Sequence, residues 1–119
     1  MRFRVELEHL PDATVVVALS GEVDLYTAPE LRDRLVEAID AGARRLVVDM
    51  TETTFIDSTT LGVLIGAVKR LRPVEGDVLL VAPDRNIRKV FEITLLDRVF
   101  PISDTLEDAL ATAPTPGSS

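Results

Sequence analysis

The order of apolar patterns along the chain limits the folds that it can adopt. Residues 3–8 alternate apolar and charged side chains, which is typical of a strand with one wet face. After the turn signal Pro11-Asp12, a β-branched run at residues 14–19 completes a hairpin. Strand and helix patterns then alternate to residue 112. Because such alternation requires a largely parallel sheet with crossover helices, the sequence predicts an α/β domain.

Cap and breaker residues set the expected bounds of the elements. A loop at residues 20–24 leads to a helix that begins at Thr27, with Glu30 at capping-box spacing, and stops at Gly42. The remaining elements are a strand at 45–50, a helix from Asp57 or Ser58 to about Arg72, a strand at 78–82, a helix capped by Asp84, an edge strand at 98–102 and a helix at 104–112. In this last helix, Asp104 and Glu107 are at cap spacing, and Leu106, Ala109 and Leu110 are expected to face inward.

These elements predict one domain over residues 1–112, followed by a disordered tail at 113–119. We expect a mixed, mostly parallel sheet of about five strands, with about four helices mainly on one face.

The composition excludes several classes of function. The 119 residues include no cysteine and one histidine, His9, so disulfides, thiolate metal sites and histidine-rich metal sites are ruled out. The formal net charge of −7 argues against nucleic acid or an anionic membrane as the main partner. The longest apolar run, residues 61–68, is too short to span a bilayer. We therefore expect a cytoplasmic protein that contacts neither nucleic acid nor membrane.

Three enzyme signatures do not match the sequence. Gly62 and Gly66 are not followed by the lysine of a P-loop, and no G-x-G-x-x-G is present. Ser58 lacks the flanking glycines of a hydrolase elbow, and its base would have to be His9, which we expect at the surface. The carboxylates fall at helix caps and on wet faces. We expect a protein that is not an enzyme and uses no metal or cofactor.

Ser58 lies at the start of the second expected helix. Backbone N–H groups without intrahelical acceptors and the helix dipole favour an anion there. A phosphate on Ser58 would add about −1.5 to −2 charge at one point, which suits a switch that changes binding while keeping the fold. A serine at this position also serves as an ordinary helix cap, and on this feature alone the cap is the simpler interpretation.

The same helix contains Gly62 and Gly66. Each glycine costs about 1 kcal/mol relative to alanine in a helix, so another backbone is expected to approach closely. That backbone belongs either to a partner or to this chain's own sheet. Val63 and Arg70 point away from the inward stripe of the helix, and an exposed Val63 beside small residues would suit a docking partner.

Three segments resemble one family. The run F-I-D-S-T-T-L-G-V-L-I-G at residues 55–66 resembles the D-S-S/T-G-L-G signature of STAS-domain anti-sigma-factor antagonists. Residues 21–32 resemble the first loop and helix of that family, and residues 93–110 resemble its C-terminal third. Because the three segments occur in the family's order, the chain is identified as a STAS-like domain across residues 3–112.

The resemblance implies a partner switch. An anti-sigma factor that is itself a serine kinase would phosphorylate Ser58, and a metal-dependent serine phosphatase would reverse the modification. The unphosphorylated form would bind the kinase and free a sigma factor, and ATP would belong to the kinase. Asp24 matches an acidic loop position of the family, with a loop cap as the alternative. The expected partner-binding residues are Gly21, Glu22, Asp24, Asp57, Ser58, Thr59, Gly62, Val63 and Gly66. We expect the protein to be a monomer or a weak dimer.

Two residues depart from the family pattern. Thr60 replaces a usual glycine and adds a third hydroxyl beside Ser58 and Thr59. Leu95 also replaces a usual glycine and would be strained in a left-handed backbone, so we expect a rearranged helix end there. The alternative function is that of a STAS ligand-binding or scaffold subunit in a transport or stress-signalling complex, which a large apolar pocket would favour.

Overall fold

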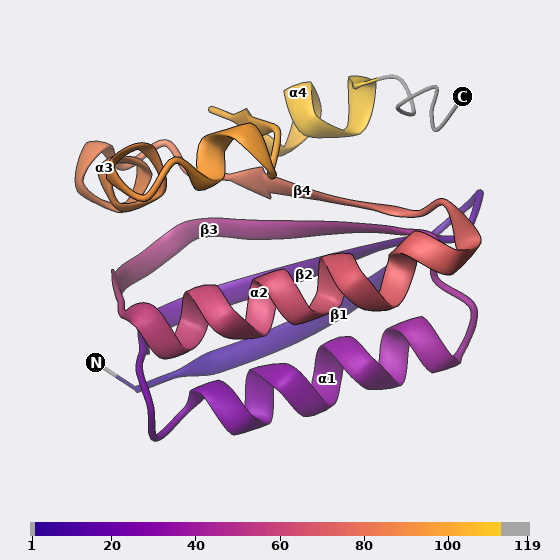
Figure 1. The fold of residues 1–119 in the computed structure, drawn as a ribbon, viewed down its shortest axis with the longest axis horizontal. Helices are drawn as coiled ribbons and strands as arrows, with labels where there is room; N and C mark the ends of the chain where they lie inside the picture. Colours follow the sequence, from indigo (N-terminus) through magenta and orange to yellow (C-terminus); the bar gives the residue numbers. More distant parts are fainter. Residues whose placement is uncertain (1, 113–119) are drawn as a thin grey trace.

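Five strands form one sheet in a computed structural model that describes residues 2–112 (Figure 1). In chain order the elements are β1 (Arg4–Leu10), β2 (Thr14–Val23), α1 (Ala28–Asp40), β3 (Arg45–Ile56), α2 (Ser58–Leu71), η1 (Arg72–Val74), β4 (Asp77–Val81), α3 (Arg85–Ile93), η2 (Leu96–Arg98), β5 (Ile102–Ser103) and α4 (Leu106–Ala111). The sheet order is β1-β2-β3-β4-β5, with β1 antiparallel to β2 and the other pairs parallel. The predicted mixed sheet is confirmed, while the tail at 113–119 lies outside the described residues.

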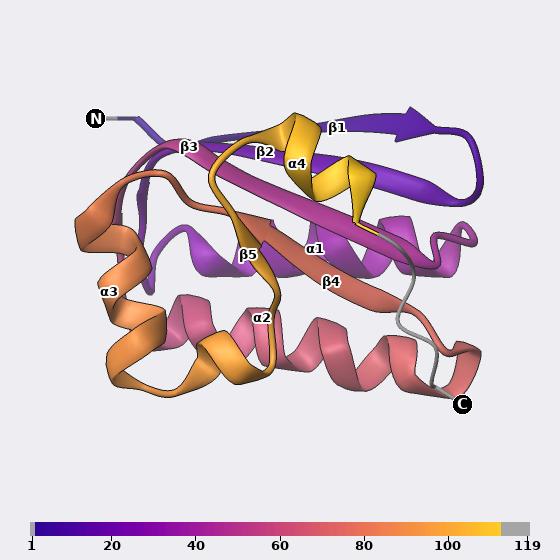
Figure 2. The same cartoon turned by 90° about the horizontal axis from the view of Figure 1, so that it is seen from above.

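Alternate residues of the central strands supply two separate cores. Val17, Val48 and Leu80 join the larger core, which α1, α2 and α3 cover. Their neighbours Val47 and Val81 point the other way and pack under α4. Figures 1 and 2 show α1 and α2 on one side of the sheet and α4 on the other. Because both faces are covered, the central strands are apolar runs, and three of the four helices share one face as expected.

The strands β2 and β3 are longer than the sequence pattern predicts. The predicted loop at 20–24 and the predicted strand end at residue 50 are both wrong, because β2 continues to Val23 and β3 to Ile56. The added residues pair with each other across two register shifts. The pairing of β3 with β4 ends at Asp49, so the rest of β3 is half exposed and carries polar residues that resemble a loop.

The helix ends follow the predictions in part. Asp84 caps α3 by accepting from two backbone N–H groups, and Gly42, at a φ of +110°, follows the end of α1 as predicted. The capping box at Thr27 and Glu30 is wrong, since the Thr27 side chain makes no cap bond. Its hydroxyl donates instead to the Glu22 carbonyl at 3.2 Å. The loop before α1 therefore uses the Thr27 hydroxyl for its own turn.

The last strand and helix are shorter than predicted. Instead of a strand at 98–102, the chain forms η2 and then the two-residue edge strand β5. The predicted cap at Asp104 is wrong, because the Thr105 hydroxyl accepts from the Asp108 N–H at 3.0 Å. Leu110, predicted to face inward, is 38% exposed, while Ala109 is buried.

Leu95 adopts the left-handed backbone conformation, with φ 63° and ψ 16°. The predicted rearrangement of this helix end is therefore wrong, and the residue keeps a conformation that favours glycine. In the part of the chain that the structure describes, no helix combines the length and the apolarity needed to cross a membrane.

Candidate functional site

The carboxyl ends of β2 and β3 bring two polar segments together. Val23 pairs with Ile56, so the loop before α1 and the start of α2 leave the sheet side by side. In open α/β sheets this edge is the usual place for a binding site, because the connecting loops leave a crevice there. The topology thus joins residues 22–27 to residues 55–60, as the partner-binding prediction assumed.

The first turn of α2 exposes Ser58 at a capped helix start. Asp57 is the N-cap, and its carboxylate accepts from the Thr60 N–H at 3.1 Å. Ser58 is the first helical residue, and both Ser58 and Thr59 are exposed. Helix geometry leaves the Ser58 and Thr59 N–H groups without an intrahelical acceptor. A phosphate on Ser58 would therefore find donors and the positive end of the helix dipole beside it.

Thr60 is the third hydroxyl of the run, and the fold encloses it. Thr60 is 0% exposed, and its hydroxyl donates to the Val23 carbonyl at 2.7 Å. This bond fastens the first turn of α2 to the last residue of β2. Thr60 is therefore a structural residue, and among the three hydroxyls only Ser58 and Thr59 are open to another protein.

Asp24 organises the loop that faces this turn. Its carboxylate accepts from the Tyr26 N–H at 2.9 Å and from the Thr27 N–H at 3.2 Å, and its own N–H donates to the Thr27 hydroxyl. These bonds match the loop-cap interpretation of Asp24. They also fix the backbone turn of residues 24–27.

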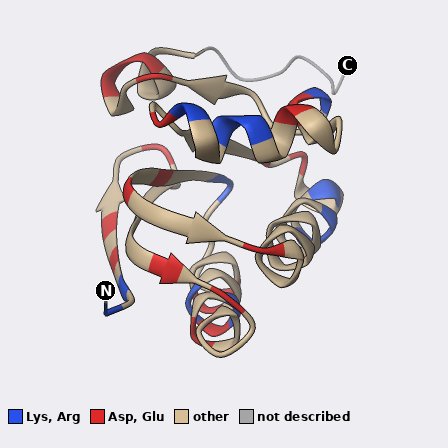
Figure 3. Cartoon of the chain, turned by 90° about the vertical axis from the view of Figure 1, so that its left-hand side faces the viewer, with Lys and Arg blue, Asp and Glu red and all other residues tan. Residues whose placement is uncertain are grey.

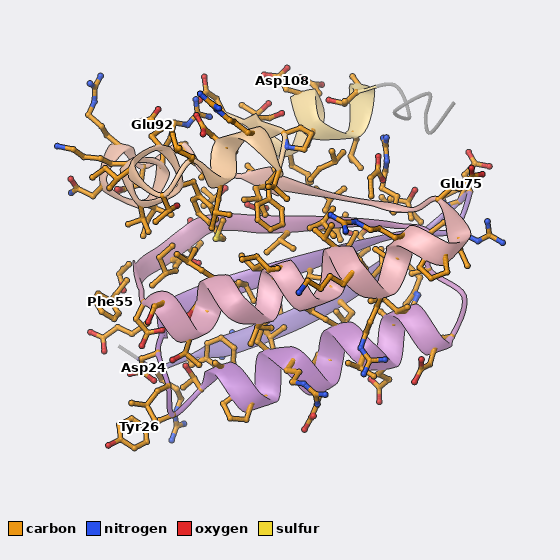
Figure 4. The ribbon with its side chains drawn as sticks, viewed as in Figure 1. Asp24, Tyr26, Phe55, Glu75, Glu92 and Asp108 are labelled. Carbon is orange, nitrogen blue, oxygen red and sulfur yellow. The ribbon has the colours of Figure 1, made fainter. Side chains whose placement is uncertain are left out.

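Three large apolar side chains that the sequence analysis missed surround this end of the molecule. Tyr26 is 84% exposed, Leu25 57% and Phe55 47%. Figure 4 shows Asp24, Tyr26 and Phe55 grouped where α1 and α2 begin. The sequence signal that could have revealed these side chains is the pair Leu25-Tyr26, two large apolar residues in a loop, where polar residues are usual. We call Leu25, Tyr26 and Phe55 the apolar rim.

Charge around the apolar rim is mostly acidic. Glu22 is exposed near the end of β2 and Glu52 is exposed in the outer half of β3, and Asp24 and Asp57 lie in the loops that follow these strands. Figure 3 looks onto this end of the molecule, where acidic segments mark the loops and strand ends. Among residues 2–112 no group of three His, Cys, Asp or Glu side chains has the arrangement of a metal site.

The remaining predicted partner residues differ in their surroundings. Gly21 is buried at a φ of +84°, and a Cβ there would lie 2.5 Å from the Arg2 carbonyl oxygen. The fold of this chain therefore requires glycine at position 21. A Cβ at Gly62 or Gly66 would meet no atom within 4 Å outside the backbone of the helix itself. The alternative that these glycines allow close packing against this chain's own sheet is therefore wrong. Val63, predicted to be exposed, is half buried and packs against the main core.

Comparison with known proteins matches this architecture. The STAS domain family model matches residues 4–109. The anti-sigma-B factor antagonist of Listeria monocytogenes is 32% identical over 105 residues, which cover 87% of this chain and 91% of that protein. The chain belongs to the STAS domain family.

Two solved structures carry the comparison further. The anti-sigma factor antagonist SpoIIAA in its unphosphorylated form is 28% identical, with a TM-score of 0.71, over 88% of this chain and 92% of that chain. The Bacillus cell fate determinant SpoIIAA in the phosphorylated form is 30% identical, with a TM-score of 0.72, over 90% and 96% respectively. Within the STAS family, its relatives thus include anti-sigma factor antagonists.

Proposed function

We propose that this protein is an anti-sigma factor antagonist that works by partner switching. The unphosphorylated form binds an anti-sigma serine kinase and so frees a sigma factor. The kinase phosphorylates Ser58, the complex separates, and a metal-dependent serine phosphatase restores the binding form. The protein itself acts by binding and supplies only the acceptor hydroxyl.

The observation that carries the proposal is the exposed Ser58 at the capped start of α2. The adjacent Thr60 hydroxyl is buried and bonded to the Val23 carbonyl, which narrows the choice of acceptor. Support also comes from the solved unphosphorylated and phosphorylated forms of SpoIIAA, a structural neighbour of this chain.

The docking surface that we propose has Ser58 at its centre. Exposed Glu22 and Thr59 lie on the two segments that meet at this edge, and exposed Gly62 follows one turn along α2. The apolar rim supplies the large side chains that protein interfaces favour. Asp24, Asp57 and the buried Gly21 shape the loops. Val63 and Gly66 stay predicted contacts farther along α2. A phosphate in the middle of this surface would be desolvated by the bound kinase, and its charge would oppose docking.

The test compares wild type with Ser58→Asp as baits in a lysate of the source organism, with the retained proteins identified by mass spectrometry. We expect wild type to retain an anti-sigma serine kinase and Ser58→Asp to lose it. Asn86→Asp is the matched control, because it adds the same charge at the exposed start of α3 and should keep the kinase.

The purified kinase and ATP then test the acceptor. We expect phosphopeptide mapping to place phosphate on Ser58, and Ser58→Ala to take up none. The melting temperature of Ser58→Asp should be unchanged or slightly raised, since an anion at a helix N-terminus contributes about 0.3–1 kcal/mol. Phosphate on Thr59 in place of Ser58, or retention of the kinase by folded Ser58→Asp, would contradict the proposal.

A further inference from the structure

A groove of about 350 Å³ runs along the seam between α1 and α2, which lie side by side in Figure 1. Its apolar lining consists of Leu35, Val36 and Ile39 of α1 and of Gly62, Val63, Gly66 and Ala67 of α2. The space above the two glycines is open, because a Cβ on either would meet no atom within 4 Å. The groove is therefore a hollow that the described chain does not fill.

The charged residues that line the groove are both arginines, Arg32 and Arg70. The whole chain has 20 Asp and Glu against 13 Lys and Arg, so a lining with two cations and no carboxylate opposes the overall balance. Arg32 approaches the exposed Asp33 at 3.9 Å, a distance and exposure at which an ion pair is weak. Among residues 2–112 no carboxylate oxygen lies within 4.0 Å of the Arg70 guanidinium.

The two arginines lie toward opposite ends of the groove. Both helices connect parallel strands, so α1 and α2 run in the same direction. Arg32 is in the second turn of α1, on the side of Thr59, whereas Arg70 is next to the last residue of α2. The stretch from Thr59 to Arg70 spans about 16 Å at 1.5 Å per residue. The groove thus combines an elongated apolar floor with a cation at each end.

We propose that this groove binds a small amphiphilic anion, with a carboxylate or phosphate headgroup on one unbranched apolar chain. The volume fits about a dozen non-hydrogen atoms at ~30 Å³ each, which corresponds to a chain of about 7–10 carbons once the headgroup atoms are counted. It lies at the small end of the range for ligand pockets.

Recognition follows from the two parts of the lining. The chain of the ligand removes apolar surface of Val36, Ile39 and Val63 from water. The headgroup accepts charge-assisted hydrogen bonds from Arg32 or Arg70, whose planar guanidinium suits carboxylate and phosphate oxygens. A cationic amphiphile of the same length would meet two like charges.

The binding test uses the isotope-labelled protein, with calorimetry and methyl NMR below the micellar concentration of each probe. We expect decanoate, decyl phosphate or both to saturate, to shift the methyl signals of Val36, Ile39 and Val63, and to bind at least tenfold tighter than decyltrimethylammonium. The relative affinity of the two anions identifies the headgroup. Equal binding of the cation, absence of saturable binding by either anion, or shifts centred on the apolar rim would overturn the proposal.

Variants locate the ligand in the groove. Gly66→Leu fills the open space and should reduce decanoate or decyl phosphate affinity at least tenfold, and Gly66→Ala serves if the larger variant does not fold by circular dichroism. The double variant Arg32→Ala/Arg70→Ala should also lose at least tenfold. Arg34→Ala on α1, outside the groove lining, should bind as wild type does. Undiminished binding by the folded Gly66 variant would overturn the site. These measurements need no kinase, so their outcome is independent of the partner-switch proposal.

Discussion

Leu95 lies between α3 and η2 in a conformation that leucine rarely adopts. Its φ is 63°, and its side chain is 56% exposed, so little packing compensates for the strain. A left-handed L-residue costs about 1–2 kcal/mol, and glycine avoids this cost because it has no Cβ.

We expect Leu95→Gly to be more stable than Leu95→Ala by about 1 kcal/mol, after allowance for the greater freedom of glycine in the unfolded chain. Both variants remove the leucine side chain, so their difference isolates the backbone. Urea denaturation of the two proteins measures it. Equal midpoints would mean that the left-handed conformation relaxes in solution.

Single residues also show where sequence reasoning reaches its limit. The sequence Ser58-Thr59-Thr60 does not indicate which of the three hydroxyls is buried. The Thr60 hydroxyl is buried because it packs against β2 and donates to the Val23 carbonyl, 37 positions earlier in the chain. Ser58 and Asp57 could be placed from local signals alone, since a helix start is encoded within a few residues. The buried partner is a tertiary fact that local patterns do not contain.

At the scale of elements, the glycines of α2 differ from the glycine that precedes β4. A Cβ at Gly62 or Gly66 would meet open space, whereas a Cβ at Gly76 would lie 2.3 Å from the Arg44 carbonyl oxygen. The fold therefore requires glycine before β4 but tolerates a methyl group on the outer side of α2.

We expect Gly62→Ala and Gly66→Ala each to stabilise the protein by up to about 1 kcal/mol, because alanine is the better helix former. Gly76→Ala, the matched control, should destabilise it by more than about 1 kcal/mol, since backbone has to move. Thermal and urea unfolding of the three variants provide the measurement. Destabilisation by the α2 substitutions would show that α2 packs more tightly than described.

The elements that could be predicted from the sequence are those whose ends carry a local signal. The hairpin, α1, α2 and α3 follow from Pro11-Asp12, Gly42, Asp57 and Asp84, and the structure confirms their places. The outer half of β3 could not be predicted, because its pairing with β2 is continued by backbone hydrogen bonds under polar side chains. Thr53, for example, is buried there and donates to the Leu19 carbonyl.

At the scale of the whole molecule, the apolar rim places three exposed apolar side chains at the end of the domain where β2 and β3 finish. Tyr26 is 84% exposed and lies on a loop whose turn is fixed by Asp24. A side chain so exposed contributes little to folding. Its place beside Ser58 agrees with a role in the proposed kinase interface.

We expect Tyr26→Asp to weaken kinase binding at least tenfold, because it adds charge to the apolar rim of the proposed interface and removes an aromatic anchor. Its free energy of unfolding should stay within about 0.5 kcal/mol of wild type. Ile93→Asp, which changes a 71% exposed residue at the end of α3, is the control and should bind normally. Calorimetry with the purified kinase measures the affinity of each variant. An equal loss of affinity in both variants would indicate nonspecific charge repulsion and contradict a role for Tyr26 in the interface.

The order of the strands across the sheet is also the order in which a ribosome makes them. Each strand that emerges finds its pairing edge already present, formed by the strand synthesised just before it. Chains grow at about 5–20 residues per second, which is slow compared with hairpin formation. The sheet can therefore extend strand by strand during translation. When β5 leaves the ribosome, only two residues of pairing remain to be made.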